Sequence, residues 1–170
     1  AKQRGRDFGI ILACLSELGY SAEWRVVNAA QYGAAQRRRR AFIFAYRNDT
    51  VYGAEMAKAD AGKVIRSDGF MVKAFPISDM GKIDRTSLEG DIVDVSDLFR
   101  FSFENDGYMH GGVIYTAKVT EREEPPVPLG EILQKNVDDR FYITVEKMPK
   151  WTYLKGAKRI PRRSPDDHEY

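Results

Sequence analysis

Cysteine and histidine are scarce in this sequence. Its 170 residues include one cysteine, Cys14, and two histidines, His110 and His168, which lie far apart in the chain. A single thiol cannot form a disulfide within the chain, and the histidines have no neighbours at the spacing of a zinc site. We therefore expect no metal site, and the low cysteine content favours a reducing compartment.

Long hydrophobic runs are also missing. No stretch approaches the ~20 apolar residues that a membrane-spanning helix needs. The basic residues at the start are followed by a broken apolar run without a cleavage pattern, which argues against a signal peptide. These absences predict a cytoplasmic protein without a membrane partner. The net charge is only +2, so a nucleic-acid site would have to come from local clusters of Lys and Arg.

The chain lacks an initial methionine: it begins at Ala1 and ends at Tyr170, in a segment that reads as unfinished. We therefore expect a fragment of a larger protein. With 43% hydrophobic residues, a chain of this length can still bury a core and form one or two small domains.

What is present at the start of the chain predicts a helix, a strand, a loop and a second strand. An apolar stripe at helical spacing indicates a helix over residues 7–18, with Asp7 as N-cap and Gly19 at its end. Strands are indicated over 22–28 and 41–46, and the unbroken apolarity of the second predicts burial on both faces. This order is compatible with the edge of an α/β sheet.

Patterns after residue 50 are weaker. Residues 99–104 alternate phenylalanine with polar residues, which predicts a half-buried strand. The other expected features are a turn at 105–107, a second turn at 110–112, a strand over 113–119 and a stiff exposed linker over 123–128. Short helices are expected over 129–134 and 145–154, the second interrupted near Pro149.

Four consecutive arginines, Arg37 to Arg40, follow Gln36 between the two expected strands. Such a run by itself is typical of a solvated basic turn or a nuclear-localisation-like patch. In an extended backbone, however, Gln36, Arg38 and Arg40 point to the same side. Planar guanidinium forks suit phosphates and carbonyl oxygens, so Arg38 and Arg40 predict a clamp for a nucleotide at the rim of a sheet.

The segment from Val27 to Asn48 resembles the DNA cytosine-5 methyltransferase family. It carries N-A-x-x-Y-G at Asn28–Gly33, the Q-x-R-x-R motif at Gln36–Arg40, and an apolar strand that ends in Arg47-Asn48. The helix expected before these motifs also suits the family. Residues 127–170 resemble the start of the target-recognition region in bacterial members, and residues 50–126 show only a loose similarity.

This resemblance implies a mixed α/β fold. Residues 1–48 would be the tail end of a Rossmann-like methyltransferase sheet within the catalytic domain. Residues 49–170 would form a small domain, an irregular α+β target-recognition region that is incomplete in this chain. The source would be a bacterial restriction–modification system.

The family transfers a methyl group from S-adenosyl-L-methionine to C5 of a cytosine that is flipped out of double-stranded DNA. A cysteine thiolate attacks C6 and a glutamate acts at N3. By the resemblance, Arg38 supports the phosphate of the flipped nucleotide and the catalytic loop, Arg40 donates to the base carbonyl, and Gln36 supports the loop. Negative charge that develops on the ring would then meet a fixed guanidinium.

Several family motifs are absent from this sequence, namely the Pro-Cys nucleophile, the Glu-Asn-Val motif, the glycine-rich cofactor loop and the closing motif. Cys14 lies in the middle of the expected helix and is interpreted as a small buried hydrophobe. The chain alone is therefore expected to be inactive and to bind no S-adenosyl-L-methionine. The intact enzyme is expected to be a monomer, whereas the fragment could self-associate through the sheet surface around Ile43 and Phe44.

Basic and aromatic residues interleave near the C-terminus, which predicts contacts with DNA phosphates and base edges. Alternatively, this segment is an exposed basic helix end whose aromatic residues pack on the core. The residues assigned to DNA are Lys150, Trp151, Tyr153, Lys155, Lys158, Arg159, Arg162 and Arg163. Two other functions stay open: a non-catalytic, sequence-specific DNA-binding module, and the related branch that methylates transfer RNA.

Overall fold

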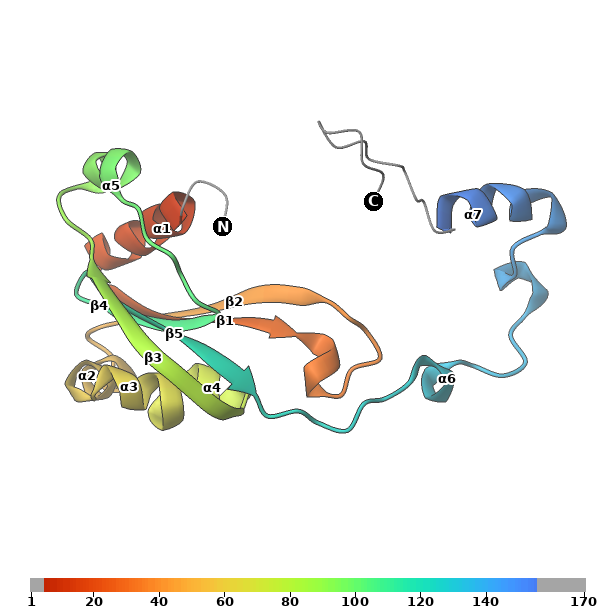
Figure 1. The fold of residues 1–170 in the computed structure, drawn as a ribbon, viewed down its shortest axis with the longest axis horizontal. Helices are drawn as coiled ribbons and strands as arrows, with labels where there is room; N and C mark the ends of the chain where they lie inside the picture. Colours follow the sequence, from red (N-terminus) through yellow and green to blue (C-terminus); the bar gives the residue numbers. More distant parts are fainter. Residues whose placement is uncertain (1–4, 156–170) are drawn as a thin grey trace, which may run out of the picture. The chain divides into compact units, whose positions relative to one another are not determined.

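A five-stranded antiparallel sheet is the framework of the computed structural model, which describes residues 5–155 (Figure 1). The strands lie in the order β2-β1-β4-β5-β3. Their bounds are β1 (Tyr20–Asn28), β2 (Arg39–Arg47), β3 (Ile77–Ser87), β4 (Asp106–His110) and β5 (Val113–Glu121). β1 and β2 form one hairpin and β4 and β5 form another, and the β1–β4 pairing joins the two into one sheet.

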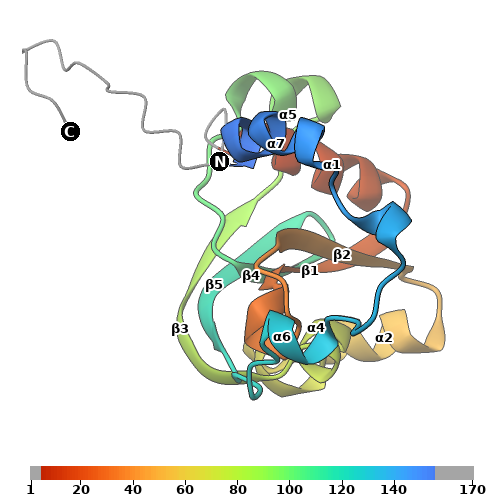
Figure 2. The same cartoon turned by 90° about the vertical axis from the view of Figure 1, so that its right-hand side faces the viewer.

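Helices cover both faces of this sheet (Figures 1 and 2). One face carries α1 (Arg6–Glu17) and α5 (Ile92–Leu98). The opposite face carries α2 (Val51–Lys58), α3 (Ala61–Lys63), the π-helix η3 (Val64–Asp68) and α4 (Phe70–Ala74). Because successive strand residues point to opposite faces, the sheet contributes side chains to two separate cores.

The core under α1 and α5 is built around Trp24, which is 2% exposed. The rings of Phe8 and Phe103 meet it edge-on, with centroids 5.2 and 5.8 Å away. Met109 of β4 lies in this core, whereas its neighbour Tyr108 lies in the core on the other face, with residues of α2 and η3. The fold is therefore a mixed α/β arrangement, as the sequence predicts.

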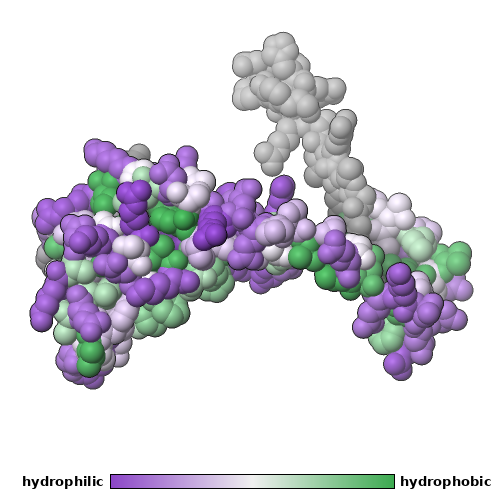
Figure 3. Space-filling model, turned by 90° about the horizontal axis from the view of Figure 1, so that it is seen from below, coloured by the Kyte–Doolittle hydropathy of each residue, from purple (hydrophilic) through white to green (hydrophobic). Residues whose placement is uncertain are grey.

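The chain divides into two compact units, residues 1–132 and 133–170. The helix α6 (Leu129–Ile132) ends the first unit. In the second unit the described elements are η4 (Asp139–Phe141), η5 (Val145–Lys147) and α7 (Met148–Lys155). Hydrophobic side chains of this unit lie at its surface beside charged ones, and Phe141 and Val145 are exposed (Figure 3).

Several predicted elements are confirmed. α1, β1, β2 and β5 match the helix and strands expected over 7–18, 22–28, 41–46 and 113–119. Gly19 has a φ of 76°, the left-handed conformation expected after the first helix. The turn at 110–112, the exposed extended segment over 123–128 and the helix α6 also agree with the sequence. The helix expected over 145–154 is split into η5 and α7, with Pro149 in the first turn of α7, where its missing N–H costs no helical hydrogen bond.

Other predictions are wrong. Residues 99–104 form no strand, although Phe99, Phe101 and Phe103 do pack on the first core. The turn expected at 105–107 is instead the start of β4. The alternation over 99–104 and the turn-type residues at 105–107 therefore reflect the packing of side chains and not the local backbone conformation.

Two details near the N-terminus also need correction. Gly5, not Asp7, is the N-cap of α1, and no side chain caps this helix. β2 is not buried on both faces, because it is an edge strand whose Phe42 and Ile43 are 44% and 43% exposed. The sheet is antiparallel at every pairing of the described strands, so the burial of a parallel sheet does not apply.

The boundary expected at residue 48 lies between β2 and α2, and strands from both sides of it share the sheet. Within residues 5–155, no helix is long and apolar enough to cross a membrane. The same residues contain no group of three or more His, Cys, Asp or Glu side chains that could hold a metal ion.

Candidate functional site

The loop between β1 and β2 is held in one conformation by hydrogen bonds at several points. The amide of Ala29 donates to the carbonyl of Arg38 at 3.0 Å, which extends the pairing of the two strands beyond their ends. Asn28 begins the short 3-10 helix η2 (Ala29–Tyr32), and Gly33 ends it with a φ of 75°. The hydroxyl of Tyr32 donates to the carbonyl of Pro76 at 3.3 Å. The arginine run therefore leaves a fixed loop rather than a free turn.

Arg38 and Arg40 line one cavity of about 310 Å³, together with Phe42 two residues further along β2. The other side chains around it are mostly apolar: Val27, Ala29, Tyr32, Ala34 and Phe75. We call this the aromatic cavity. The ring of Phe75 lies 5.4 Å from that of Tyr32 and 5.2 Å from that of Phe42, at angles of 65° and 43°. Two guanidinium groups thus stand at the rim of an aromatic recess that could accept a flat ring.

A buried ion pair lies behind the aromatic cavity. Arg25 of β1 is 0% exposed and pairs with Asp106 of β4. The same guanidinium donates to the carbonyl of Phe75, so it fastens the end of α4 to the sheet. Burial raises the pKa of Asp106, and the Arg25 guanidinium opposes this shift. Burial also raises the pKa of the Tyr32 phenol. Arg25 therefore fixes the Phe75 wall of the cavity from behind.

Arg37 and Arg39 line a different cavity, of about 550 Å³, whose third lining residue is Asn28. We call this the polar cavity. The alternation of side chains along an extended chain separates the odd-numbered arginines from the even-numbered ones. All four are exposed, and among the described residues none of them forms an ion pair with a carboxylate. Gln36 is exposed in the loop and lines neither cavity.

The chain is similar to known proteins over almost its whole length. A family model described as C-5 cytosine-specific DNA methylase matches residues 1–168. The chain belongs to this family. It is also similar to the type II methyltransferase M.Sau3AI of Staphylococcus aureus, with 47% identity over 173 residues that cover 100% of this chain and 42% of that relative. The chain thus spans less than half the length of this relative, and no solved structure matches it.

The C-terminal residues assigned to DNA belong to the second unit, whereas the arginine run belongs to the first. Lys150, Trp151 and Tyr153 are exposed on α7 of this C-5 cytosine-specific DNA methylase chain. Lys155 is the last residue of that helix. The remaining four, Lys158, Arg159, Arg162 and Arg163, fall outside the described residues.

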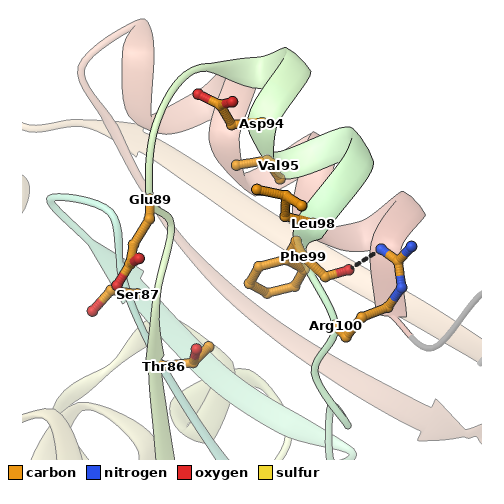
Figure 4. Close-up of a pocket in the computed structure, with 8 residues that line it drawn as sticks. All are labelled: Thr86, Ser87, Glu89, Asp94, Val95, Leu98, Phe99 and Arg100. Carbon is orange, nitrogen blue, oxygen red and sulfur yellow. Dashed lines mark hydrogen bonds between the residues drawn. The ribbon is translucent and has the colours of Figure 1, made fainter.

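A further cavity of the methylase chain, of about 280 Å³, lies between β3 and α5 (Figure 4). Two of its polar side chains form local hydrogen bonds. Asp94 accepts a hydrogen bond from the amide of Asp91 at 3.1 Å, as part of the capping box of α5. Arg100 donates to the carbonyl of Phe99 at 2.6 Å. Asp94 is therefore used to cap α5, and we assign no ligand to this cavity.

Sequence reasoning missed the buried polar residues that support the site. Arg25, Asp106 and Phe75 were not singled out, because nothing local marks them as partners across 81 and 50 positions of the chain. Glu23 was missed for the same reason. The one available signal was the pair of charged residues at alternate positions of a strand with apolar neighbours, which predicts either a solvated face or buried ion pairs.

Proposed function

We propose that this chain is part of a DNA cytosine-5 methyltransferase of the restriction–modification type. The intact enzyme would transfer a methyl group from S-adenosyl-L-methionine to C5 of a flipped cytosine in a specific sequence of double-stranded DNA. One observation carries the proposal: Arg38 and Arg40 face a single aromatic cavity within a chain of this family. The relative M.Sau3AI, a type II methyltransferase, supports it.

The aromatic cavity suits an extruded cytosine. A flat ring could stack among Phe42, Phe75 and Tyr32, while the guanidinium groups of Arg38 and Arg40 reach a phosphate and the ring carbonyl. Attack at C6 spreads negative charge over that carbonyl and N3. A donor held in place before the reaction, in a site with few competing waters, stabilises this charge more than water can. Arg40 would donate at the carbonyl, Arg38 at the phosphate, and Gln36 would support the loop.

S-adenosyl-L-methionine would supply the methyl group in the intact enzyme. The two arginine cavities do not fit it, because its sulfonium is cationic and both cavities present guanidinium groups without a carboxylate. We therefore assign no cofactor contact to these residues. The nucleophilic cysteine would also come from outside this chain, since Cys14 lies in α1 and is only partly exposed. The chain alone should be inactive.

The remaining assignments follow from the same proposal. Residues 1–48 would end the catalytic domain, as the tail of its Rossmann-like sheet, and 49–170 would form the target-recognition region. The exposed positions of Lys150, Trp151 and Tyr153 on α7 support DNA contacts by these residues, and the proposal extends the contacts to Lys155, Lys158, Arg159, Arg162 and Arg163. The enzyme would act as a monomer in the bacterial cytoplasm, and exposed Phe42 and Ile43 support self-association of the isolated chain.

The test is Arg40→Ala in the full-length enzyme. Turnover should fall on the order of a hundredfold or more, because one transition-state donor is lost. DNA affinity should change far less. Turnover is measured by transfer of labelled methyl groups to unmethylated plasmid DNA, and affinity by fluorescence anisotropy.

Arg47→Ala is the matched control, because Arg47 lies on the same strand but pairs with Asp49 at 2.6 Å, away from both arginine cavities. Equal losses of turnover and affinity in Arg40→Ala would contradict the role proposed here. A wild-type enzyme that labels transfer RNA and not DNA would overturn the substrate.

A further inference from the structure

We propose that Arg37, Arg39 and Asn28 form a second anion site, which holds a backbone phosphate of the bound DNA strand. The site lies in the polar cavity, on the side of the arginine run away from Arg38 and Arg40. This inference rests on the proposed function, because it takes DNA as the ligand. It adds two arginines that the Q-x-R-x-R motif leaves unassigned.

The geometry brings the three side chains to one place. Asn28 of β1 is the direct partner of Arg39 of β2 in the antiparallel register. Side chains of such a pair stand on the same face, with Cβ atoms about 5 Å apart. Arg37 precedes Arg39 by two residues in an extended segment and therefore shares that face. All three line the same cavity.

No carboxylate of the described residues forms an ion pair with the charges at this place. In residues 5–155 the four ion pairs involve Arg25, Arg47, Lys82 and Arg140, and neither Arg37 nor Arg39 is among them. Two guanidinium groups held on one face repel each other, and an anion bound between them would offset this electrostatic repulsion. Asn28 accepts from the amide of Ala30 at 3.4 Å through its Oδ1, so its Nδ2 group is oriented by that contact and can donate.

The chemistry of the polar cavity selects a phosphate rather than a base. Its side chains offer guanidinium and amide donors, and no aromatic ring lines it on which a base could stack. The aromatic cavity has the opposite character, with Phe42, Phe75 and Tyr32 around its two guanidinium groups. Donors without a stacking surface are typical of contacts that fix the position of the DNA backbone and read no sequence.

Alternate arginines of one segment therefore line different cavities and would contact different parts of the DNA. Arg38 and Arg40 would act on the extruded nucleotide, and Arg37 and Arg39 would hold the neighbouring backbone. The hydrogen bonds of Ala29 and Tyr32 hold the loop that carries all four arginines, so the two cavities keep fixed positions.

The experiment compares the full-length wild-type enzyme with the double variant Arg37→Gln/Arg39→Gln. Affinity for an unmethylated duplex is measured by fluorescence anisotropy from about 50 to about 300 mM KCl, a range over which counterion release changes the affinity strongly. The slope of log Kd against log salt should fall by about 0.9, because the proposed site holds one phosphate and each lost phosphate contact removes about that much. Turnover at saturating DNA should stay within about twofold, because a uniform loss of binding affects KM and not kcat.

Arg47→Gln/Arg66→Gln is the matched control, since it removes two exposed arginine charges of the same unit outside both cavities. Its slope should stay near that of the wild type. Arg37→Lys/Arg39→Lys should keep the slope and lose part of the affinity, because lysine retains the charge without the planar fork.

An unchanged slope in Arg37→Gln/Arg39→Gln would overturn the site, and so would an equal fall in the control. A hundredfold loss of turnover would also overturn it, because these arginines would then act in the chemical step. In each of these cases the wild-type enzyme still methylates DNA, so the proposed function stands. A wild-type enzyme that neither binds nor methylates DNA would remove both proposals.

Discussion

Glu23 and Arg25 are two charged side chains on β1 that the fold buries almost completely. They lie two residues apart, so both point to the face covered by α2, η3 and α4. Glu23 accepts from the hydroxyl of Tyr52 at 2.7 Å and from the amide of Met71 at 2.9 Å. Arg25 pairs with Asp106 and donates to the carbonyl of Phe75. Each charge therefore ties the helical layer to the sheet, and Arg25 does so directly behind the aromatic cavity.

Replacing Arg25 tests this role. Arg25→Met should destabilise the fold by about 3–5 kcal/mol, because it leaves Asp106 buried without its cation. The double variant Arg25→Met/Asp106→Leu should cost less than the sum of the two single changes, since an apolar pair does not leave an unpaired charge. Urea-induced unfolding, followed by the fluorescence of buried Trp24, measures all three. Additive costs would show that the two side chains act independently.

The sequence predicts part of the aromatic cavity around the arginine run but not all of it. The side on which Arg38 and Arg40 stand follows from the two-residue period of extended chain, and the sequence is enough to predict it. The partner of that pair, Phe75, comes from the end of α4 and meets Phe42 only in the folded chain. A contact between positions so far apart has no local signal, which is why the aromatic wall was not predicted.

At the scale of elements, helices and strands were predicted where hydrophobic residues recur at a regular spacing. They were missed where a residue is selected by packing against a distant part of the chain. α1 has a clear helical stripe, and β1 and β5 are rich in strand-forming residues, so all three were predicted. Asn105-Asp106-Gly107 has the composition of a turn but begins β4. Gly107 is needed there because the indole of Trp24 and the carbonyl of Tyr115 occupy the space that a Cβ would take. Long-range packing, not backbone preference, selects this glycine.

Gly107→Ala should therefore destabilise β4. The added methyl group must displace the Trp24 ring or the backbone of β5, and such overpacking typically costs about 1–3 kcal/mol. Gly130→Ala is the control, because nothing lies within 4 Å of a Cβ at that position and its conformation suits alanine. The urea midpoints and the near-ultraviolet circular dichroism of the tryptophans compare the two. A cost no greater than that of Gly130→Ala would contradict the close approach.

On the scale of the whole molecule, the first unit is one sheet with a core on each face, built from strands that precede and follow residue 48. The mixed α/β character could be predicted from the sequence. The assembly of one sheet from both sides of residue 48 could not, because hydrophobic residues over 50–98 show little helical or strand periodicity.

The core under α2 and η3 is rich in phenols: Tyr46 and Tyr108 are buried, and Tyr52 packs against them. Burial raises the pKa of all three, that of Tyr108 to about 12.

This phenol-rich core predicts alkaline destabilisation. Unfolded tyrosines lose their protons near pH 10, whereas the folded state keeps these phenols neutral. Their contribution to stability is therefore complete below about pH 10 and is lost as the pH rises toward 12, by up to about 1.4 kcal/mol per pH unit for each phenol. The urea midpoint should therefore fall between about pH 10 and 12, above the pKa of the unfolded phenols.

Two variants test whether the phenol-rich core causes the fall of the urea midpoint at alkaline pH. Tyr108→Phe should weaken the pH dependence, because it removes one of the shifted phenols. Tyr142→Phe, at an exposed position of the second unit, should leave it unchanged. Identical pH profiles for wild type and Tyr108→Phe would show that other groups cause the alkaline loss.

The separation of odd and even arginines onto two sides has a consequence for insertions and deletions in this loop. If one residue inserted before Gln36 moved β2 by one position, Arg37 and Arg39 would take the places of Arg38 and Arg40 in the aromatic cavity, but Ala41 would take the place of Phe42. One residue deleted there would bring Arg39 and Ala41 to the places of Arg38 and Arg40, and the cavity would lose one guanidinium group. The run of four arginines thus preserves the guanidinium pair when the hairpin lengthens by one residue but not when it shortens, whereas either change removes Phe42 from the aromatic wall.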